Sequence, residues 1–508
     1  MNLKKTVLAT ALALAAPAAF AAAPASPTDT AGALVIYMTG ASAPDEFMES
    51  IMTGMLNAGF YKYKDAANGT ATARAFLGEV KNDSTIPASI RNQKVLFIKR
   101  SAGGSVFGVN PLARSEAISV LKAADASCSA APDTDGYYTC PMVGVDPGVG
   151  TATGQEMVPD FGVSDVAPFM FKEPFNVEFG AGQLSTAETA SLTIRSVNTV
   201  MMGMVATAAV PSSAYLSEAD YGAMLTGNLT DWSQVGAGVS PAGGNQVVVC
   251  RRHPGSGTQT SYNWYFNNFP CTTTSSTSGV SGNTTPARMD SSWGFGAGGS
   301  GTSADPFLID VTAGYTVIEN SGSGDVRRCL NAAQTGTDYT FKGEDGQYYK
   351  ANFSAVGDAL GAIGVLSLDS QEKTGAAVGA DTKPSDKGAE TAWFFRTLNG
   401  AGVMAKNANG VADETCSSSG TLSGVCPNRS ALREGQYAFA AELTMQYRSS
   451  LAGQKRAFAD EFIDRAGDPS FQKPWTLALP PVYDPTSDAA VAKGTRFGNM
   501  CSPLQKLF

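Results

Sequence analysis

A glycine-rich loop near the middle of the chain joins a strand-like segment to a helix-like one. Residues 246–250 are valine-rich, Arg252 follows them, and the loop reads Gly-Ser-Gly-Thr over 255–258. Aromatic residues then recur at the i, i+3, i+4, i+7 spacing of one buried helical face. These residues are Tyr262, Tyr265, Phe266 and Phe269. A strand that passes through a short loop into a helix predicts an α/β fold.

The same loop has the chemistry of an anion site. The first N–H groups of a helix lack intrahelical partners and carry the positive end of the helix dipole. Glycines allow close approach of the backbone to an oxyanion, Ser256 and Thr258 add hydroxyl donors, and Arg252 adds a permanent charge. The tetrapeptide recurs at 299–302, but without a nearby arginine. We therefore interpret that second copy as an ordinary loop.

Three other segments share this design. Residues 34–38 predict a strand, which leads through a turn to a helix from Asp45 onward. Residues 95–98 predict a strand that runs into a glycine-rich turn, and 159–165 place Asp165 beside small residues. Open α/β sheets bind ligands in a crevice where such strand ends meet. We expect the four segments to converge there.

The N-terminus predicts export. Lys4 and Lys5 precede an apolar stretch over 6–16 and small residues near 21–23, which is the pattern of a cleaved signal peptide over 1–23. No later apolar stretch reaches the ~20 residues needed to span a bilayer. We expect a periplasmic or extracellular protein that is not inserted in a membrane.

The net charge of the chain limits the classes of binding partner that we expect. Without Lys4 and Lys5 the chain has 34 basic and 45 acidic residues, a net charge of about −11. Such an acidic chain is a poor candidate for nucleic acid or anionic membranes. Anion binding must then depend on local dipoles and a few placed cations. We expect a monomer.

Eight cysteines in an oxidising compartment predict disulfides. Two pairs bracket short polar loops and are expected to be bridged, namely Cys128 with Cys140 and Cys416 with Cys426. Cys250 could pair with Cys271 across the anion loop, which would leave Cys329 with Cys501. Zinc is a weak alternative because no Cys-x-x-Cys pair occurs and His253 is the one histidine.

The length of the chain favours two lobes, because some 485 mature residues are more than a single hydrophobic core usually organises. We expect lobe I to hold 33–204 plus 439–508, and lobe II to hold 205–438. Strands near 199–209 and 437–447 are the expected hinge crossings. The segments 106–158, 272–304 and 405–430 are interpreted as insertions or surface loops.

Several motifs in this order resemble the phosphate-binding component of bacterial phosphate ABC transporters and its extracellular relatives, the DING proteins. These motifs are Thr-Gly-Ala-Ser-Ala-Pro at 39–44, Ser-Ala-Gly-Gly at 101–104, Phe-Gly-Val-Ser-Asp at 161–165, Leu-Thr-Gly-Asn-Leu-Thr-Asp-Trp at 225–232, Arg-Arg-His-Pro-Gly-Ser-Gly-Thr at 251–258 and Gly-Ala-Ile-Gly-Val at 361–365. The chain differs at Pro254, where the family has an acid, and in the insertion 106–158. The resemblance implies a type 2 periplasmic binding protein fold, with two α/β lobes that close on a ligand.

The resemblance also implies a set of ligand contacts. They are loop N–H groups at Ser42 and Ala43, the Ser101 hydroxyl, the Asp165 carboxylate, the Arg252 guanidinium, and the cradle of Ser256, Gly257 and Thr258. Asp165 would accept the proton of hydrogen phosphate, which sulfate lacks. Arg100, beside Ser101, is either a second cation of the site or a surface charge.

The sequence thus predicts a secreted binding protein for a tetrahedral oxyanion, most simply phosphate, that serves uptake through an ABC permease. It would be no enzyme and would carry no cofactor or metal. Two alternatives stay open: a DING-like extracellular phosphatase, with Ser256 or a metal-bound water as nucleophile, and an adhesive surface protein on the same fold.

Overall fold

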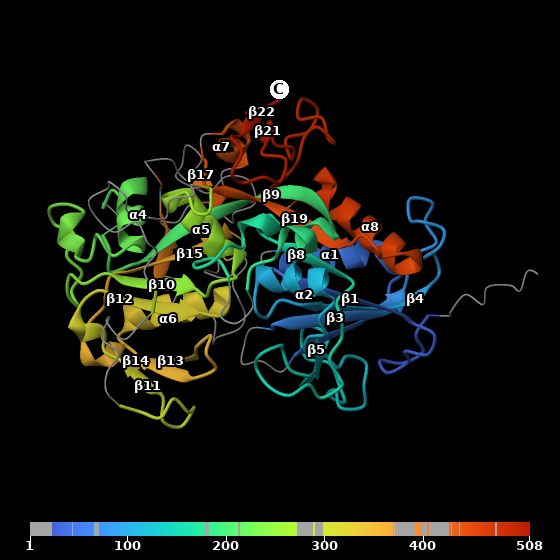
Figure 1. Ribbon diagram of the computed structural model, residues 1–508, viewed down its shortest axis with the longest axis horizontal. Coiled ribbons are helices and arrows are strands. Elements are labelled where there is room, and N and C mark those ends of the chain that lie inside the picture. Colours follow the sequence, from blue (N-terminus) through green and yellow to red (C-terminus); the bar gives the residue numbers. More distant parts are fainter. Residues whose placement is uncertain are drawn as a thin grey trace, which may run out of the picture.

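The chain folds around one large sheet, seen here in a computed structural model (Figure 1). The structure describes residues 23–507 with the following exceptions: 43, 66–70, 178–181, 212–213, 272–287, 290–297, 369, 371–391, 397, 399–403, 406–425, 428, 436 and 473–474. Residues 1–22 of the predicted signal peptide 1–23, and most of the predicted insertions 272–304 and 405–430, therefore lie outside the described residues.

Within the described residues, a mixed sheet of 13 strands runs through the whole molecule. Its order is β12 (Thr316–Asn320), β10 (Val248–Arg252), β15 (Ala362–Ser367), β9 (Leu192–Thr207), β19 (Ala440–Arg448), β8 (Phe161–Ser164), β1 (Leu34–Gly40), β4 (Lys94–Arg100), β3 (Ala73–Glu79), β2 (Tyr61–Asp65) and β6 (Tyr137–Cys140), with β16 (Trp393–Phe395) and β20 (Thr476–Ala478) paired to β9. Helices pack against this sheet, so the predicted α/β class is confirmed.

The long strand β9 joins the two parts of the sheet. Its first ten residues pair with β19, whereas residues 202–207 pair with β15 and β16. In Figure 1, β10, β12 and β15 lie on one side of β9 and β19, and β1, β3 and β4 lie on the other. The predicted crossings at 199–209 and 437–447 are therefore strands, although β9 begins earlier than expected.

The helices are α1 (Asp45–Met55), α2 (Asn110–Arg114), α3 (Thr186–Ala190), α4 (Glu218–Leu225), α5 (Gly257–Asn267), α6 (Ser323–Thr335), α7 (Arg429–Glu434) and α8 (Gly453–Gly467). Local sequence explains several of their starts. Ser185 and Ser217 begin α3 and α4 with capping boxes, and Ser256 caps α5. Gly336 ends α6 in the left-handed conformation that glycine adopts without strain.

Several smaller sheets accompany the main one. Their strands are β5 (Val120–Leu121) with β7 (Met142–Val143), β11 (Phe307–Ile309) with β14 (Tyr348–Ala351) and β13 (Tyr339–Lys342), β17 (Met404–Ala405) with β18 (Cys426–Pro427), and β21 (Gly494–Thr495) with β22 (Gln505–Lys506). The second Gly-Ser-Gly-Thr segment lies in a turn beside β11, as expected of an ordinary loop.

Apolar residues from both sides of β9 form one continuous core. It contains Trp232, Trp264 and the methionines of residues 201–204, all of which were expected in the interior. The aromatic face predicted for α5 is only partly right. The side chains of Gly257 to Trp264 are all buried, so the first two turns are covered on every side, whereas Tyr265 and Phe266 are half-buried.

The structure corrects two of the expected disulfides. Cys128–Cys140 is formed as predicted, but Cys250 pairs with Cys329 and Cys271 pairs with Cys501. The error came from weighting closeness along the chain. Cys250 on β10 lies under α6, which carries Cys329, whereas Cys271 follows α5 and meets the C-terminal segment. Cys416 lies outside the described residues, so its predicted bond with Cys426 stays a prediction.

No helix in the described part of the chain is both long enough and apolar enough to cross a bilayer.

Candidate functional site

The predicted strand, loop and helix around Arg252 are present. Strand β10 ends at Arg252 and α5 begins at Gly257. The Ser256 hydroxyl accepts a hydrogen bond from the N–H of Gln259 at 3.3 Å, and the Gln259 side-chain oxygen accepts one from the N–H of Arg252 at 3.2 Å. Gln259 therefore fixes the loop at both ends.

The Arg252 guanidinium is oriented by the start of α6. Its Nη2 donates to the carbonyl oxygen of Ser321 at 2.7 Å, and its Nη1 donates to the hydroxyl of Ser323 at 3.1 Å. Only 3% of the side chain is exposed. These two hydrogen bonds orient a guanidinium that stays protonated at any physiological pH.

Asp165 lies directly against the loop. Its Oδ2 accepts a hydrogen bond from the Thr258 hydroxyl at 3.0 Å. Its Oδ1 is buried and has no hydrogen-bond partner among the described residues. Burial raises the pKa of Asp165, although the Thr258 hydrogen bond and the charges of Arg252 and Lys99 act in the opposite direction. A buried carboxylate oxygen without a donor is costly, and a protonated ligand oxygen could satisfy it.

The glycine-rich turn after β4 meets the loop from the other side. The N–H of Val106 donates to the carbonyl oxygen of Gly255 at 2.9 Å, and the Ser105 hydroxyl accepts from the N–H of Asp165 at 3.2 Å. A Cβ on Gly257 would stand 2.3 Å from the Ser105 hydroxyl oxygen, so only glycine permits this approach. Three of the four predicted segments therefore meet around Gly257, and the fourth adjoins them, because the N–H of Ala41 donates to the carbonyl oxygen of Val163 at 2.9 Å.

Ser101 has a different partner from the one predicted. Its hydroxyl donates to Asp45 Oδ2 at 2.7 Å, at the start of α1. Lys99 Nζ donates to Asp45 Oδ1 at 2.7 Å, and Arg74 Nη1 lies 3.2 Å from Oδ2. Burial alone would raise the pKa of Asp45, but the Lys99 and Arg74 charges outweigh it and the pKa is lowered.

This buried ion pair of Asp45 and Lys99 was missed by the sequence analysis. The sequence did contain a signal for this pair: an acid stands at the first position of a predicted helix, and a lysine stands near the end of a strand-like segment. Ser42 precedes α1, is half-buried, and accepts a hydrogen bond from the N–H of Asp45 through its carbonyl oxygen at 3.0 Å. Ala43 lies outside the described residues.

A cavity of about 630 Å³ opens beside Arg252 and Ser256. It lies between the segment 100–149, which includes the Cys128–Cys140 insertion, and the segment 252–346. Of the predicted site residues, Arg252 and Ser256 line it. Asp165 and Thr258 lie behind this wall, Gly257 packs on Ser105, and Ser42 and Ser101 are not part of the lining.

Arg100 forms part of the same cavity wall. Its side chain is 3% exposed, so it is no surface charge. Nη2 pairs with Asp146, and the guanidinium carbon lies 4.6 Å from the centre of the Phe107 ring. Among the described residues, no group accepts a hydrogen bond from its Nε or Nη1.

His253 is packed into the protein beside the cavity. Its side chain is 7% exposed, and its Nε2 lies 3.2 Å from the carbonyl oxygen of Glu319. Burial lowers its pKa to about 4, with the Glu319 charge opposing and the Arg252 charge reinforcing the shift. The imidazole is therefore neutral at neutral pH.

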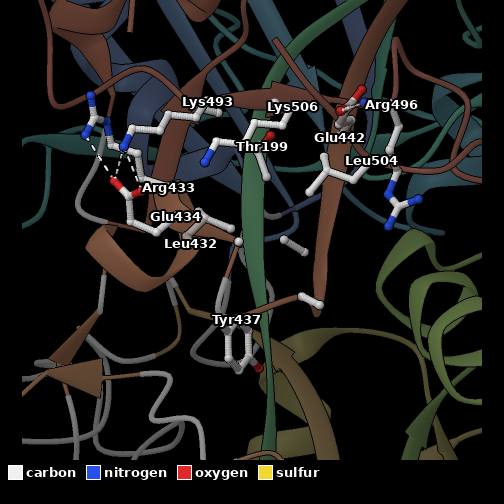
Figure 2. A pocket seen from close by; sticks show the side chains of 15 residues that line it. Thr199, Leu432, Arg433, Glu434, Tyr437, Glu442, Lys493, Arg496, Leu504 and Lys506 are labelled. Atoms are coloured by element: carbon white, nitrogen blue, oxygen red, sulfur yellow. Dashed lines mark hydrogen bonds and ion pairs between the residues drawn. The ribbon is translucent and has the colours of Figure 1, made fainter. Parts of the chain in front are cut away.

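A second, smaller hollow of about 90 Å³ lies where α7 and the C-terminal strands cover β9 and β19 (Figure 2). Figure 2 shows Arg433 and Lys493 converging on the Glu434 carboxylate, with Lys493 Nζ 2.6 Å from Oε1. Glu442 accepts hydrogen bonds from the Thr495 hydroxyl at 2.9 Å and from the N–H of Gly498 at 2.6 Å. The carboxylates here are occupied by the protein itself.

Among the described residues, no group of three or more His, Cys, Asp or Glu side chains is placed to hold a metal ion.

Comparison with known proteins found no matching family model and no matching curated protein. Solved structures do match. A substrate-binding protein assigned to a phosphate ABC transporter of Clostridium perfringens, crystallised with phosphate, is 11% identical with a TM-score of 0.39, over 88% of this chain and 99% of that one.

Two further matches are similar in kind. An ABC-type phosphate transport receptor from Vibrio cholerae is 11% identical with a TM-score of 0.33, over 84% of this chain and 93% of its own. A phosphate-binding protein from Stenotrophomonas maltophilia is 13% identical with a TM-score of 0.32, over 86% of this chain and 84% of its own. At such identity the matches do not assign a ligand to this chain.

Proposed function

We propose that this chain is an exported binding protein for a tetrahedral oxyanion, of which phosphate is the simplest. The observation that carries the proposal is the meeting of Arg252, Asp165 and the 255–258 loop with the turn after β4. These groups come from three separate strand ends and place a guanidinium, hydroxyl donors and one unsatisfied carboxylate oxygen together. Converging donors of this kind suit an oxyanion.

In this proposal the anion binds at the Arg252 and Ser256 end of the cavity. Parting of the contact between Ser105 and Gly257 would bring Asp165 within reach of the anion. Its free Oδ1 would then accept the proton of hydrogen phosphate, and sulfate would be rejected for lack of that proton. Contacts from Ser42, Ala43 and the Ser101 hydroxyl stay predictions, and the last requires Ser101 to leave Asp45.

We further propose that two lobes, 33–204 plus 439–508 and 205–438, close around the anion by bending at β9 and β19. The pairing of β9 with strands on both sides supports this division. A closed monomer in the periplasm would then present the anion to an ABC permease, with no chemistry performed on it.

Ligand-dependent thermal unfolding tests the proposal. The exported chain is titrated with phosphate, arsenate, sulfate and molybdate, and the shift in melting temperature is measured. Phosphate at 100 times its Kd should add about 2.7 kcal/mol to the free energy of unfolding. Sulfate should have little effect. A larger shift with sulfate would contradict the role of Asp165, and no shift with any oxyanion would refute the function.

A further inference from the structure

The cavity beside Arg252 is far larger than one inorganic oxyanion requires. Its volume of about 630 Å³ falls within the roughly 300–1,000 Å³ of sites that enclose small organic ligands. A water molecule occupies about 30 Å³ of liquid, and a tetrahedral oxyanion is the size of a few waters. We propose that the physiological ligand is a phosphate monoester of a small polyol, such as a sugar phosphate. This inference rests on the proposed oxyanion site.

The phosphoryl group is assigned to the inner end of the cavity. Arg252 and Ser256 form that wall, and Arg100 contributes a second guanidinium. Arg100 is buried, and its Nε and Nη1 have no acceptor among the described residues, although both are strong donors. Both nitrogens are shielded from solvent, so ligand oxygens would satisfy them once the packing over Arg100 opens. Asp146 holds Arg100 in place and is itself fixed by the Ser119 hydroxyl at 3.0 Å.

The outer part of the cavity has room and polarity for the alcohol portion. Its walls are the turn around Gly148 and Val149 on one side and the 342–346 turn on the other. The 342–346 turn carries Lys342, Glu344 and Asp345, which suit a hydroxylated group better than an acyl chain.

The charged side chains of the outer walls also suit a hydroxyl-rich portion of the ligand. Glu344 pairs with Arg288 at 3.3 Å, and Asp345 accepts from the Tyr349 hydroxyl at 2.5 Å. Both acids thus have partners from the protein and can still accept from ligand hydroxyls. Lys342 lines the cavity and makes no ion pair within the described part of the chain.

The test compares inorganic phosphate, glycerol 3-phosphate, glucose 6-phosphate and glucose by titration calorimetry on the exported chain. The wild-type chain should bind glucose 6-phosphate at least tenfold more tightly than phosphate, and glucose alone should not bind. The variant V149W places a large side chain at the outer wall, on a lining residue that is 71% exposed. V482W is the matched control at a residue outside the cavity lining that is 78% exposed. V149W should weaken ester binding tenfold or more and leave phosphate binding unchanged, whereas V482W should change neither.

The outcomes separate this inference from the proposed function. Phosphate binding that equals or exceeds the binding of every ester overturns the monoester and leaves the oxyanion site standing. Ester binding that V149W does not weaken overturns the placement of the alcohol portion. Binding of none of the phosphate compounds refutes the oxyanion site itself.

Discussion

Two hollows in this protein are lined by basic side chains, yet they differ in what those side chains already bind. In the C-terminal hollow, Glu434 neutralises Arg433 and Lys493 within about 90 Å³. In the 630 Å³ cavity, Arg252 is held by neutral oxygens and Arg100 keeps two donor nitrogens without a described acceptor. We therefore propose that anion binding in the cavity depends on donors that the protein leaves unsatisfied, and that a cluster of cations alone does not make such a site.

The largest effect is expected from the ion pair behind the cavity. Asp45→Asn removes the charge that compensates the buried Lys99, and breaking such a pair costs about 3–5 kcal/mol. Urea unfolding should show this loss. Glu49→Gln, on the same helix but in the more exposed pair with Lys62, is the control and should cost much less. Equal losses would show that burial does not distinguish the two pairs.

The next largest effect is expected on phosphate affinity, when one arginine from each hollow is replaced. Arg252→Met should weaken phosphate binding by on the order of 100-fold, because a charge-assisted hydrogen bond contributes roughly 1.5–3 kcal/mol and a guanidinium can form two of them. Arg433→Met should leave the affinity unchanged. Titration calorimetry measures both. Similar affinities for the two variants would remove Arg252 from the site.

A smaller effect is the pH dependence of stability that we expect from His253, which lies beside the 630 Å³ cavity. The pKa of His253 is lowered to about 4 in the folded chain, from an ordinary value of 6.5. The unfolded chain therefore binds a proton that the folded chain does not, so stability is present above pH 6.5 and is lost as the pH falls towards 4. The loss should be about 3 kcal/mol, since each unit of pKa shift corresponds to about 1.4 kcal/mol.

His253→Gln should remove most of this loss between pH 6.5 and 4.5 in urea unfolding. Because the chain has one histidine, its imidazole proton resonance can be followed without assignment. That resonance should not titrate above about pH 5. A midpoint near 6.5 would contradict the burial of the ring.

The smallest effect is expected in the C-terminal hollow. The Lys493 hydrogen bond lowers the pKa of Glu434, but the pair is solvent-exposed and salt screens it. Glu434→Gln should therefore leave the melting temperature nearly unchanged in 0.5 M salt, with phosphate binding intact. A marked loss of phosphate binding would mean that the two hollows are coupled.

Local pattern was enough to predict the elements that deliver the site. Residues 248–252 form a buried strand, and the valines at its start make a continuous apolar run without the apolar and polar alternation of a half-exposed strand. Ser256 begins α5 because its hydroxyl caps the first turn. The place of Asp165 beside Thr258 was predicted from the family resemblance, since no local rule pairs residues 93 positions apart.

The sequence by itself determined the strand, loop and helix around Arg252, since hydrophobic period, capping and glycine act over a few residues. Only the tertiary structure decided that Cys250 bonds to Cys329, that Lys99 is buried against Asp45, and that Arg100 lines a large cavity. These contacts join residues 46 to 79 positions apart. Their energies depend on burial and on which partners the fold brings together, and neither is encoded in any short segment.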